Sequence, residues 1–148
     1  MTPPEKAEAL IRRYYAACNA ADAAALADCF TEDAVHYFPP GFPGEVWRGR
    51  AALAENWARF ARKLNGHWTL DRFLSAPDGR EAVIEWTNFT EGRITRGGEW
   101  YLFDDAVERI REVRAYFAAP LEPGRAAHEL AGFDYAGRGY PTERPSEG

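Results

Sequence analysis

Three histidines are the side chains of this chain best suited to proton transfer at neutral pH, and one of them, His36, lies in a β-prone stretch. A histidine on a strand that faces a cavity can act as a general base. The same residue can instead be a buried histidine that is hydrogen bonded within the core. His36, His67 and His128 have no metal-ligand spacing, so we predict no metal site.

Two further strand-like stretches carry charged candidates. Glu85 alternates with apolar neighbours, so it faces either a cavity or solvent. Arg114 and Tyr116 share one face, and Arg114 can bind a substrate carboxylate or pair with a glutamate. The chain has no G-x-S-x-G, P-loop or dinucleotide motif, and we expect no cofactor.

The composition indicates one domain rich in aromatic residues. The chain has 148 residues, of which 14% are aromatic. This content fits either a core of large residues or an aromatic-lined cavity. The net charge of −5 and the lack of a basic stripe argue against nucleic acid or an anionic membrane as partners. With two separate cysteines, no signal peptide and no long apolar run, we expect a cytoplasmic location.

The first 30 residues predict two helices. Thr2 and Glu5 have the spacing of a capping box at the start of the first helix. Apolar residues then recur at helical spacing over residues 10–18. Asp22 is placed to cap a short second helix.

The next segment predicts one strand, one loop and one helix. Residues 34–38 are β-prone, and residues 39–44 contain too much proline and glycine for regular structure. Residues 50–64 have one apolar helical face, which includes Trp57, and Asn65 with the glycine after it ends this helix.

After residue 66 the apolar period changes from about 3.6 to 2, which predicts strands. An order of three helical segments with one early strand among them, followed by antiparallel strands, indicates an α+β fold with a helix layer on one face of the sheet. The expected strands are residues 67–74, 81–90, 94–103 and 109–118.

The character of the chain changes again near residue 120. We divide it into a domain over residues 1–120 and a C-terminal arm and tail over residues 121–148, with a short helix at 127–130. Phe133, Tyr135 and Tyr140 are spaced among glycines in the arm. A disordered tail seldom carries such rings, so we expect residues 127–140 to pack on the body or on a partner subunit, or to cover a pocket mouth.

Two stretches resemble the ketosteroid isomerase-like (SnoaL-like) branch of the NTF2-like superfamily. Residues 13–22 read R-Y-Y-A-A-C-N-A-A-D, as in the first helix of those isomerases. Residues 99–103 (E-W-Y-L-F) and 113–117 (V-R-A-Y-F) match two of their late strands. The resemblance implies an NTF2-like cone, in which three N-terminal helices pack on a strongly curved antiparallel sheet around an apolar pocket. It also implies a homodimer.

The resemblance assigns roles to individual residues. Tyr14 stands in the place of the isomerases' catalytic tyrosine, and Glu99 in that of an acid held neutral to donate to an oxyanion. Phe38 stands where they have a general base, and it cannot take a proton. His36 shares the strand face of Phe38 and becomes the candidate base. We therefore predict that Tyr14, His36 and Glu99 line one cavity, with Glu99 at least partly neutral.

The function predicted first is a cofactor-independent isomerase, dehydratase or cyclase that acts by proton transfer on a hydrophobic carbonyl compound. A non-catalytic ligand-binding or dimerisation module is the alternative. Water addition of the epoxide hydrolase type needs an Asp-Arg-Asp set, which we cannot place in the sequence. The candidate substrate-binding residues are Phe38, Trp57, Glu85, Tyr101, Arg114 and Tyr116.

Overall fold

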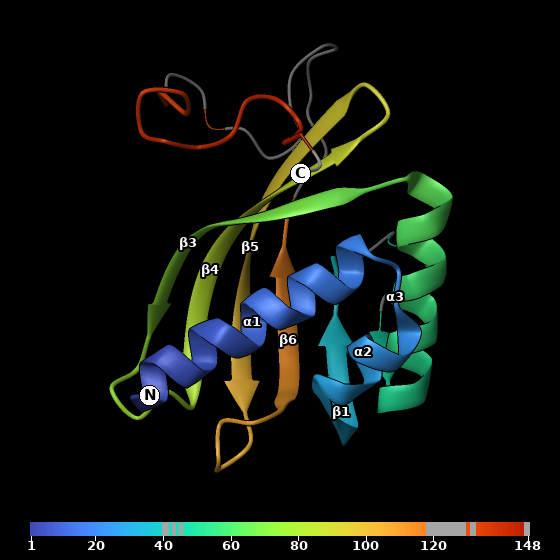
Figure 1. Cartoon of the computed structure of the whole chain (residues 1–148), viewed down its shortest axis with the longest axis vertical. Coiled ribbons are helices and arrows are strands. Elements are labelled where there is room, and N and C mark those ends of the chain that lie inside the picture. The colour runs from blue at the N-terminus through green and yellow to red at the C-terminus, as the bar shows by residue number, and fades with distance from the viewer. Residues whose placement is uncertain (40–41, 43, 45, 118–129, 131–132, 147–148) are drawn as a thin grey trace.

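The computed structural model describes residues 1–39, 42, 44, 46–117, 130 and 133–146 (Figure 1). Helices and one sheet form an α+β fold, as the sequence predicted. In chain order the elements are α1 (Pro3–Asn19), α2 (Ala23–Asp28), β1 (Phe30–Tyr37), β2 (Val46–Arg48), α3 (Arg50–Leu64), β3 (His67–Ser75), β4 (Glu81–Thr90), β5 (Arg93–Phe103) and β6 (Ile110–Tyr116).

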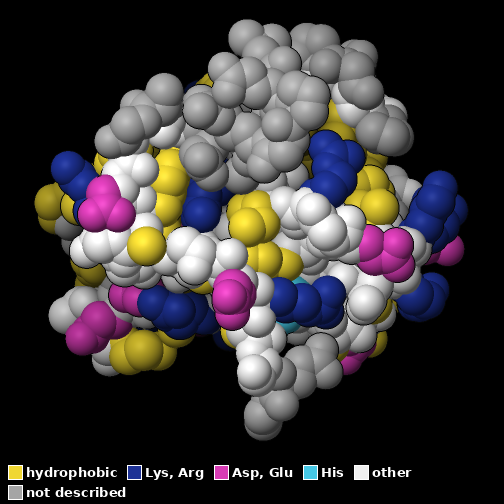
Figure 2. Space-filling model, turned by 90° about the horizontal axis from the view of Figure 1, so that it is seen from above, with side chains coloured by type: hydrophobic (Ala, Val, Ile, Leu, Met, Phe, Trp, Pro, Cys, Tyr) yellow, Lys and Arg dark blue, Asp and Glu magenta, His cyan; other side chains and the backbone are white. Residues whose placement is uncertain are grey.

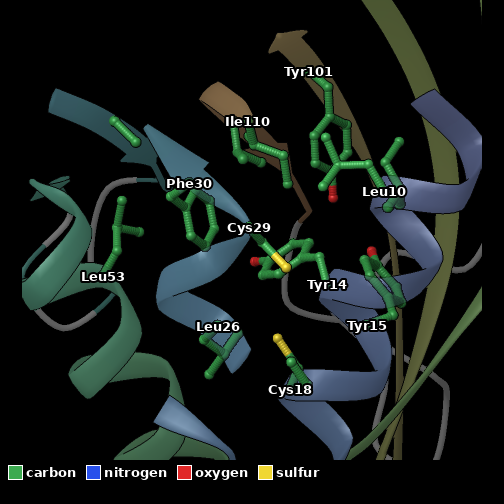
Figure 3. Close-up of a cluster of buried hydrophobic side chains, with 14 of the residues drawn as sticks. Leu10, Tyr14, Tyr15, Cys18, Leu26, Cys29, Phe30, Leu53, Tyr101 and Ile110 are labelled. Atoms are coloured by element: carbon green, nitrogen blue, oxygen red, sulfur yellow. The ribbon is translucent and has the colours of Figure 1, made fainter. Parts of the chain in front are cut away.

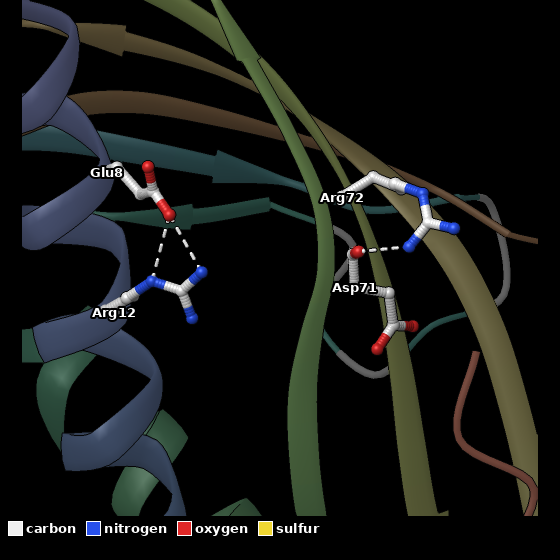
Figure 4. A network of polar contacts seen from close by, with 4 residues as sticks. All are labelled: Glu8, Arg12, Asp71 and Arg72. Atoms are coloured by element: carbon white, nitrogen blue, oxygen red, sulfur yellow. Dashed lines mark hydrogen bonds and ion pairs between the residues drawn. The ribbon is translucent and has the colours of Figure 1, made fainter. Parts of the chain in front are cut away.

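The helices begin and end where local sequence signals place them. At the start of α1, Thr2 Oγ1 accepts from the Glu5 amide at 3.3 Å, and Glu5 Oε2 accepts from the Thr2 amide at 2.7 Å. These reciprocal bonds satisfy two amides that a helix start leaves unpaired. On the exposed side of α1, Arg12 pairs with Glu8 one turn away at 2.8 Å (Figure 4). Asn65 ends α3 in the left-handed conformation.

Strand β1 is longer than predicted, and β2 was not predicted. The cap at Asp22 starts α2 as expected, and β1 follows at Phe30 almost without a loop. β2 has only three residues and pairs with β1 through His36 and Trp47. Three residues are too few to show the apolar alternation that predicts a strand. β2 forms because it pairs with β1, which the local sequence does not indicate.

One six-stranded sheet has the order β2-β1-β6-β5-β4-β3. The prediction of an antiparallel sheet is wrong at one position, because β1 runs parallel to β6. The predicted early strand among the helices is confirmed, since β1, joined by β2, lies between α2 and α3. A parallel pair joins strands that are far apart in the chain, and local patterns do not contain this information. Figure 1 shows α1 crossing the curved sheet and α3 beside β1.

The core lies between the helices and the concave face of the sheet. Alternation along β4 turns Ile84 and Trp86 inward, where both are buried, and leaves Glu85 exposed on the outer face. On β5, Tyr101 and Phe103 face inward and are also buried. The inner face of the sheet therefore carries the aromatic residues that the composition indicated.

The described part of the C-terminal arm packs on the outer face of the sheet. The ring of Tyr140 is 8% exposed, and its hydroxyl donates to Glu85 Oε2 at 2.8 Å. The guanidinium of Arg96 on β5 lies 4.1 Å from the ring centroid of Tyr135. None of the described arm residues lines the concave cavity. The expected boundary at residue 120 and most of the expected helix at 127–130 lie outside the described residues.

The surface shows no segregation of charge on the face seen in Figure 2. Basic side chains lie there beside acidic and hydrophobic ones. Among the described helices, none combines the length and the apolar character needed to cross a membrane. The expectations about partners and cellular location stay predictions.

Candidate active site

A cavity of about 180 Å³ opens between helices α1 and α3 and the concave face of the sheet. Its walls are mostly aromatic side chains, which suits an apolar ligand. The aromatic wall consists of Phe38, Phe42, Trp57, Phe60, Trp68, Trp86 and Phe117. Polar and smaller residues complete the lining, namely Tyr14, Tyr15, Cys18 and Glu99 together with Leu64, Asn88, Thr90, Arg93, Thr95 and Ala115.

Glu99 is the carboxylate at this cavity, and it is 7% exposed. Its Oε1 accepts hydrogen bonds from the hydroxyls of Tyr15 and Tyr101, each at 2.7 Å. Its Oε2 lies 3.5 Å from His36 Nε2. Four buried polar groups thus meet at one point, which is a common arrangement for proton-transfer chemistry.

Three elements bring these groups together, and His36 comes from β1. Glu99 and Tyr101 are two residues apart on β5, so both side chains point to the concave face. Tyr15 comes from the buried face of α1, which crosses the sheet at this height. The contact between Tyr15 and Glu99 therefore depends on the packing of helix on sheet.

The tyrosines at the site stay protonated at neutral pH. Burial, and then the charge of Glu99, raises the pKa of Tyr15 and of Tyr101 well above the ordinary value. Burial also raises the pKa of Tyr14, with smaller effects of Cys18 and Glu99. The hydroxyls of Tyr15 and Tyr101 therefore act as hydrogen-bond donors to Glu99. The neutral state predicted for Glu99 stays a prediction.

The tyrosine that bonds Glu99 is Tyr15, and the assignment of this contact to Tyr14 is corrected. Tyr14 also lines the cavity, but its ring packs edge-on against Phe30 with centroids 5.2 Å apart. In Figure 3 the hydroxyls of Tyr15 and Tyr101 lie close together, while Tyr14 points toward Cys29. Consecutive helical residues point about 100° apart, so the two hydroxyls take different directions, and only that of Tyr15 bonds Glu99.

His36 is fully buried and does not line the cavity, contrary to the prediction. Its ring stacks on Phe38 at 4.0 Å, and Phe38 rather than His36 contacts the cavity. His36 Nδ1 lies 3.2 Å from the carbonyl oxygen of Tyr37. A carbonyl only accepts, so Nδ1 carries a hydrogen. Nε2 faces Glu99 Oε2 at 3.5 Å and has no hydrogen-bond partner among the described residues. His36 thus acts on a substrate only through Glu99.

The other candidate substrate-binding residues divide between the two faces of the sheet. Phe38 and Trp57 line the cavity, and Tyr101 reaches it through Glu99. Three candidates do not line the cavity, because strand alternation places their side chains on the outer face, and for Glu85 and Arg114 this matches the alternative left open by the sequence. Glu85 is exposed there and binds Tyr140, Arg114 Nε lies 3.5 Å from Glu112 Oε2, and Tyr116 is 55% exposed.

Sequence reasoning missed the polar residues on the β4–β5 hairpin. Asn88, Thr90, Arg93 and Thr95 line the cavity on the concave face. The signal was present, because Asn88 interrupts an otherwise apolar face of β4 that includes Trp86. This signal could be interpreted only with the pairing register of β4 and β5. The register sets Asn88 opposite Thr95 and Thr90 opposite Arg93.

Glycine at position 97 shapes one wall of the cavity. A Cβ atom at Gly97 would lie 2.4 Å from Cζ2 of Trp86, the residue paired with it across the two strands. The indole of Trp86 can lie over β5 only because this side chain is missing. Any larger residue at position 97 would displace the indole.

Comparisons with known proteins agree with this architecture. A crystal structure of a protein of unknown function with a cystatin-like fold, from Methylobium petroleophilum PM1, is 42% identical; the match covers 98% of this chain and 97% of that chain with a TM-score of 0.74. SalBIII, an epoxide hydrolase/cyclase-like enzyme in pyran ring formation in polyether salinomycin, is 18% identical over 76% of this chain and 90% of its own, with a TM-score of 0.64.

A third similar structure, assigned as a polyketide cyclase from Xanthomonas campestris pv. campestris, is 21% identical over 78% of this chain and 92% of its own, with a TM-score of 0.61. The last two likenesses concern the fold alone. None of the curated proteins matches the chain. The model of the SnoaL-like domain matches residues 11–113, which is most of the chain, and the chain therefore belongs to the SnoaL-like family.

Proposed function

We propose that this SnoaL-like protein is an enzyme of the isomerase or lyase type that moves a proton on a small hydrophobic carbonyl compound. One observation carries the proposal. A buried carboxylate, Glu99, lies at an aromatic cavity and is held by two tyrosine hydroxyls and one histidine. Such a group costs stability, so it points to a function rather than to packing.

Glu99 is the catalytic residue of the proposed mechanism. In its ionised form Glu99 can take a proton from a carbon next to the substrate carbonyl. The electron pair of that C–H bond moves to the carbonyl oxygen and forms an enolate. Tyr15 also lines the cavity, and once Glu99 has taken the proton, the Tyr15 hydroxyl can turn from Glu99 and donate its one hydrogen to the enolate oxygen.

The fate of the enolate decides the reaction type. Return of the proton from Glu99 to another carbon of the same molecule gives isomerisation. Departure of a β-hydroxyl group as water, with the proton from Glu99, gives dehydration. Attack of the enolate carbon on a second carbonyl of the same molecule, with the proton from Glu99 ending on the new alkoxide, gives aldol-type cyclisation. None of these reactions needs an oxidant or a reductant.

Water addition of the epoxide hydrolase type has less support. Among the described residues that line the cavity, Glu99 is the one carboxylate and Arg93 the one arginine. An Asp-Arg-Asp set around a water therefore has no counterpart in this described lining. The likeness to SalBIII, at 18% identity, concerns the fold and does not carry the reaction over.

Exchange of substrate hydrogens for deuterium tests proton transfer without knowledge of the product. The purified protein is incubated in D₂O with a panel of small aryl ketones and cyclic enones, and the loss of α-proton signals is followed by NMR. We expect faster exchange for at least one compound. Glu99→Gln should reduce the catalysed rate by about 10²–10⁴, the usual worth of a general base.

Glu55→Gln is the matched control, since Glu55 is an exposed glutamate on α3 outside the cavity. It should exchange α-protons at the wild-type rate. If compounds bind in the cavity but no exchange exceeds the buffer rate, the protein is a binding module and the enzyme proposal is wrong. If Glu99→Gln retains the full exchange rate, the role of Glu99 is wrong.

A further inference from the structure

One part of the cavity lining is polar and differs from its aromatic walls. Asn88 and Thr90 on β4 stand opposite Thr95 and Arg93 on β5, in alternate register pairs that share one face of the sheet. All four line the cavity, so they form one compact patch at the hairpin end of the concave face. Elsewhere on this face of β4 the residues are apolar.

This hairpin patch has hydrogen-bond donors without matching acceptors. Asn88 is 7% exposed, and its Nδ2 has no hydrogen-bond partner among the described residues. Arg93 is exposed at the mouth, and no carboxylate of the described chain lies within ion-pair distance of it. A buried amide donor left unpaired is costly, so the patch is complementary to a ligand that brings acceptor oxygens.

The two charged residues of the lining have opposite sign and lie far apart. Glu99 is separated from Thr95 by four residues of β5, or about 13 Å along a strand, and from Arg93 by about 20 Å. An anionic group is repelled by Glu99 and attracted by Arg93. The aromatic wall between them favours a flat apolar body.

The size of the cavity limits this body. An apolar cavity of about 150 Å³ accommodates benzene, and the cavity here measures about 180 Å³. A ligand with one ring, or with two small fused rings, therefore fits in the cavity between the hairpin patch and Glu99. A polycyclic skeleton of four rings exceeds the space available.

We propose that the hairpin patch binds the carboxylate of a small aromatic acid whose other end faces Glu99. This inference rests on the proposed function for the chemistry at Glu99, and it adds the substrate class and the orientation. Arg93 and Asn88 contact the carboxylate and determine specificity. The substrate carbonyl that reacts lies at the opposite end of the ring.

Binding of a matched pair of probes tests the patch separately from turnover. Isothermal titration calorimetry at low ionic strength compares 2-naphthoate with 2-naphthamide, which have the same shape but differ in charge. The wild-type protein should bind 2-naphthoate about tenfold more tightly than 2-naphthamide. This factor is the one expected for a single, partly exposed hydrogen bond between Arg93 and the carboxylate. Arg93→Gln should reduce this preference to less than about twofold, and Asn88→Ala should weaken naphthoate binding.

Arg111→Gln is the control, because Arg111 is exposed on β6 outside the lining, and it should keep the preference. Glu99→Gln should keep or raise this preference, because it removes the negative charge that repels the carboxylate. Equal affinity for the two probes, or a preference that survives Arg93→Gln, overturns the proposal. Loss of the preference in Glu99→Gln shows the reverse orientation and also overturns it. Failure of both probes to bind contradicts the inferred ligand size.

The two proposals fail in different ways. A naphthoate preference without α-proton exchange supports the hairpin patch and refutes the enzyme. Exchange without the preference supports the enzyme and refutes the patch.

Discussion

The hydroxyl of Tyr15 on α1 donates a 2.7 Å hydrogen bond to Glu99 Oε1 on β5, across 84 residues of sequence. Tyr101 donates to the same oxygen, and His36 faces the other oxygen of the carboxylate. Glu99 is thus held from a helix and from two strands. Changes in any of these neighbours should alter its chemistry more than the stability of the fold.

The two adjacent tyrosines of α1 should differ in their effect on rate. Tyr15→Phe removes one of two hydroxyl donors to Glu99 while it keeps the ring, and we expect the rate of α-proton exchange to fall by about 10²–10³. Tyr14→Phe removes a hydroxyl that does not bond Glu99, so its loss should be much smaller. Steady-state kinetics of both variants checks this order. A larger loss in Tyr14→Phe would favour the assignment based on resemblance.

Replacement of His36 should change the pH dependence of the reaction. His36→Phe keeps a ring against Phe38 and Trp57 but removes the nitrogen that faces Glu99 Oε2. We expect kcat/KM to fall by roughly tenfold or more and the acid limb of its pH profile to move. His36→Gln, which keeps a polar group, should recover part of the rate. An unchanged profile in both variants would mean that His36 is only a packing residue.

The protein should lose stability in alkali. Burial raises the pKa of Tyr14, Tyr15 and Tyr101 well above the ordinary value. Above about pH 10 the unfolded chain releases these protons while the folded chain keeps them, so the free energy of unfolding falls as pH rises. Each tyrosine contributes a slope of about 1.4 kcal/mol per pH unit.

Urea unfolding between pH 8 and pH 11 measures this slope, and absorbance of tyrosinate shows when each group ionises. The buried thiols of Cys18 and Cys29, whose pKa values are raised chiefly by burial, add to the loss from about pH 8.5. A free energy of unfolding that does not change up to pH 11 would contradict the burial of the three tyrosines.

The C-terminal arm should stabilise the sheet. Tyr140→Ala removes a nearly buried ring that Arg72 covers at 4.4 Å and whose hydroxyl donates to Glu85. We expect a loss of about 2–4 kcal/mol in the free energy of unfolding. Tyr140→Phe loses only the hydrogen bond and should cost about 1 kcal/mol. Equal costs for the two variants would show that the ring is not packed in solution.

A homodimer stays a prediction, and the outer face of the sheet supports it. Trp100 and Tyr116 lie on that face and are 40% and 55% exposed. Large apolar side chains exposed on one face are typical of a protein–protein contact. Sedimentation at micromolar concentration should give about twice the mass of one chain. Trp100→Lys should shift the equilibrium toward the monomer. A monomer at all concentrations would contradict this prediction.

Local patterns were sufficient for most elements of the fold. The helix at residues 50–64 and the strand at residues 81–90 match the structure at both ends, because period and cap residues act over a few neighbours. The parallel pairing of β1 with β6 could not be predicted in this way, because it joins segments that only the complete sheet brings together.

The candidate site shows the same division. The sequence by itself determined which residue types are available: a glutamate on β5, a pair of tyrosines on α1, a histidine beside Phe38 and a large aromatic content. The tertiary structure alone decided which tyrosine reaches Glu99, that His36 lies behind the carboxylate, and that Arg93 faces the cavity while Arg114 does not. The physical reason is that helix rotation and strand register set side-chain direction, and both are fixed by packing between distant segments.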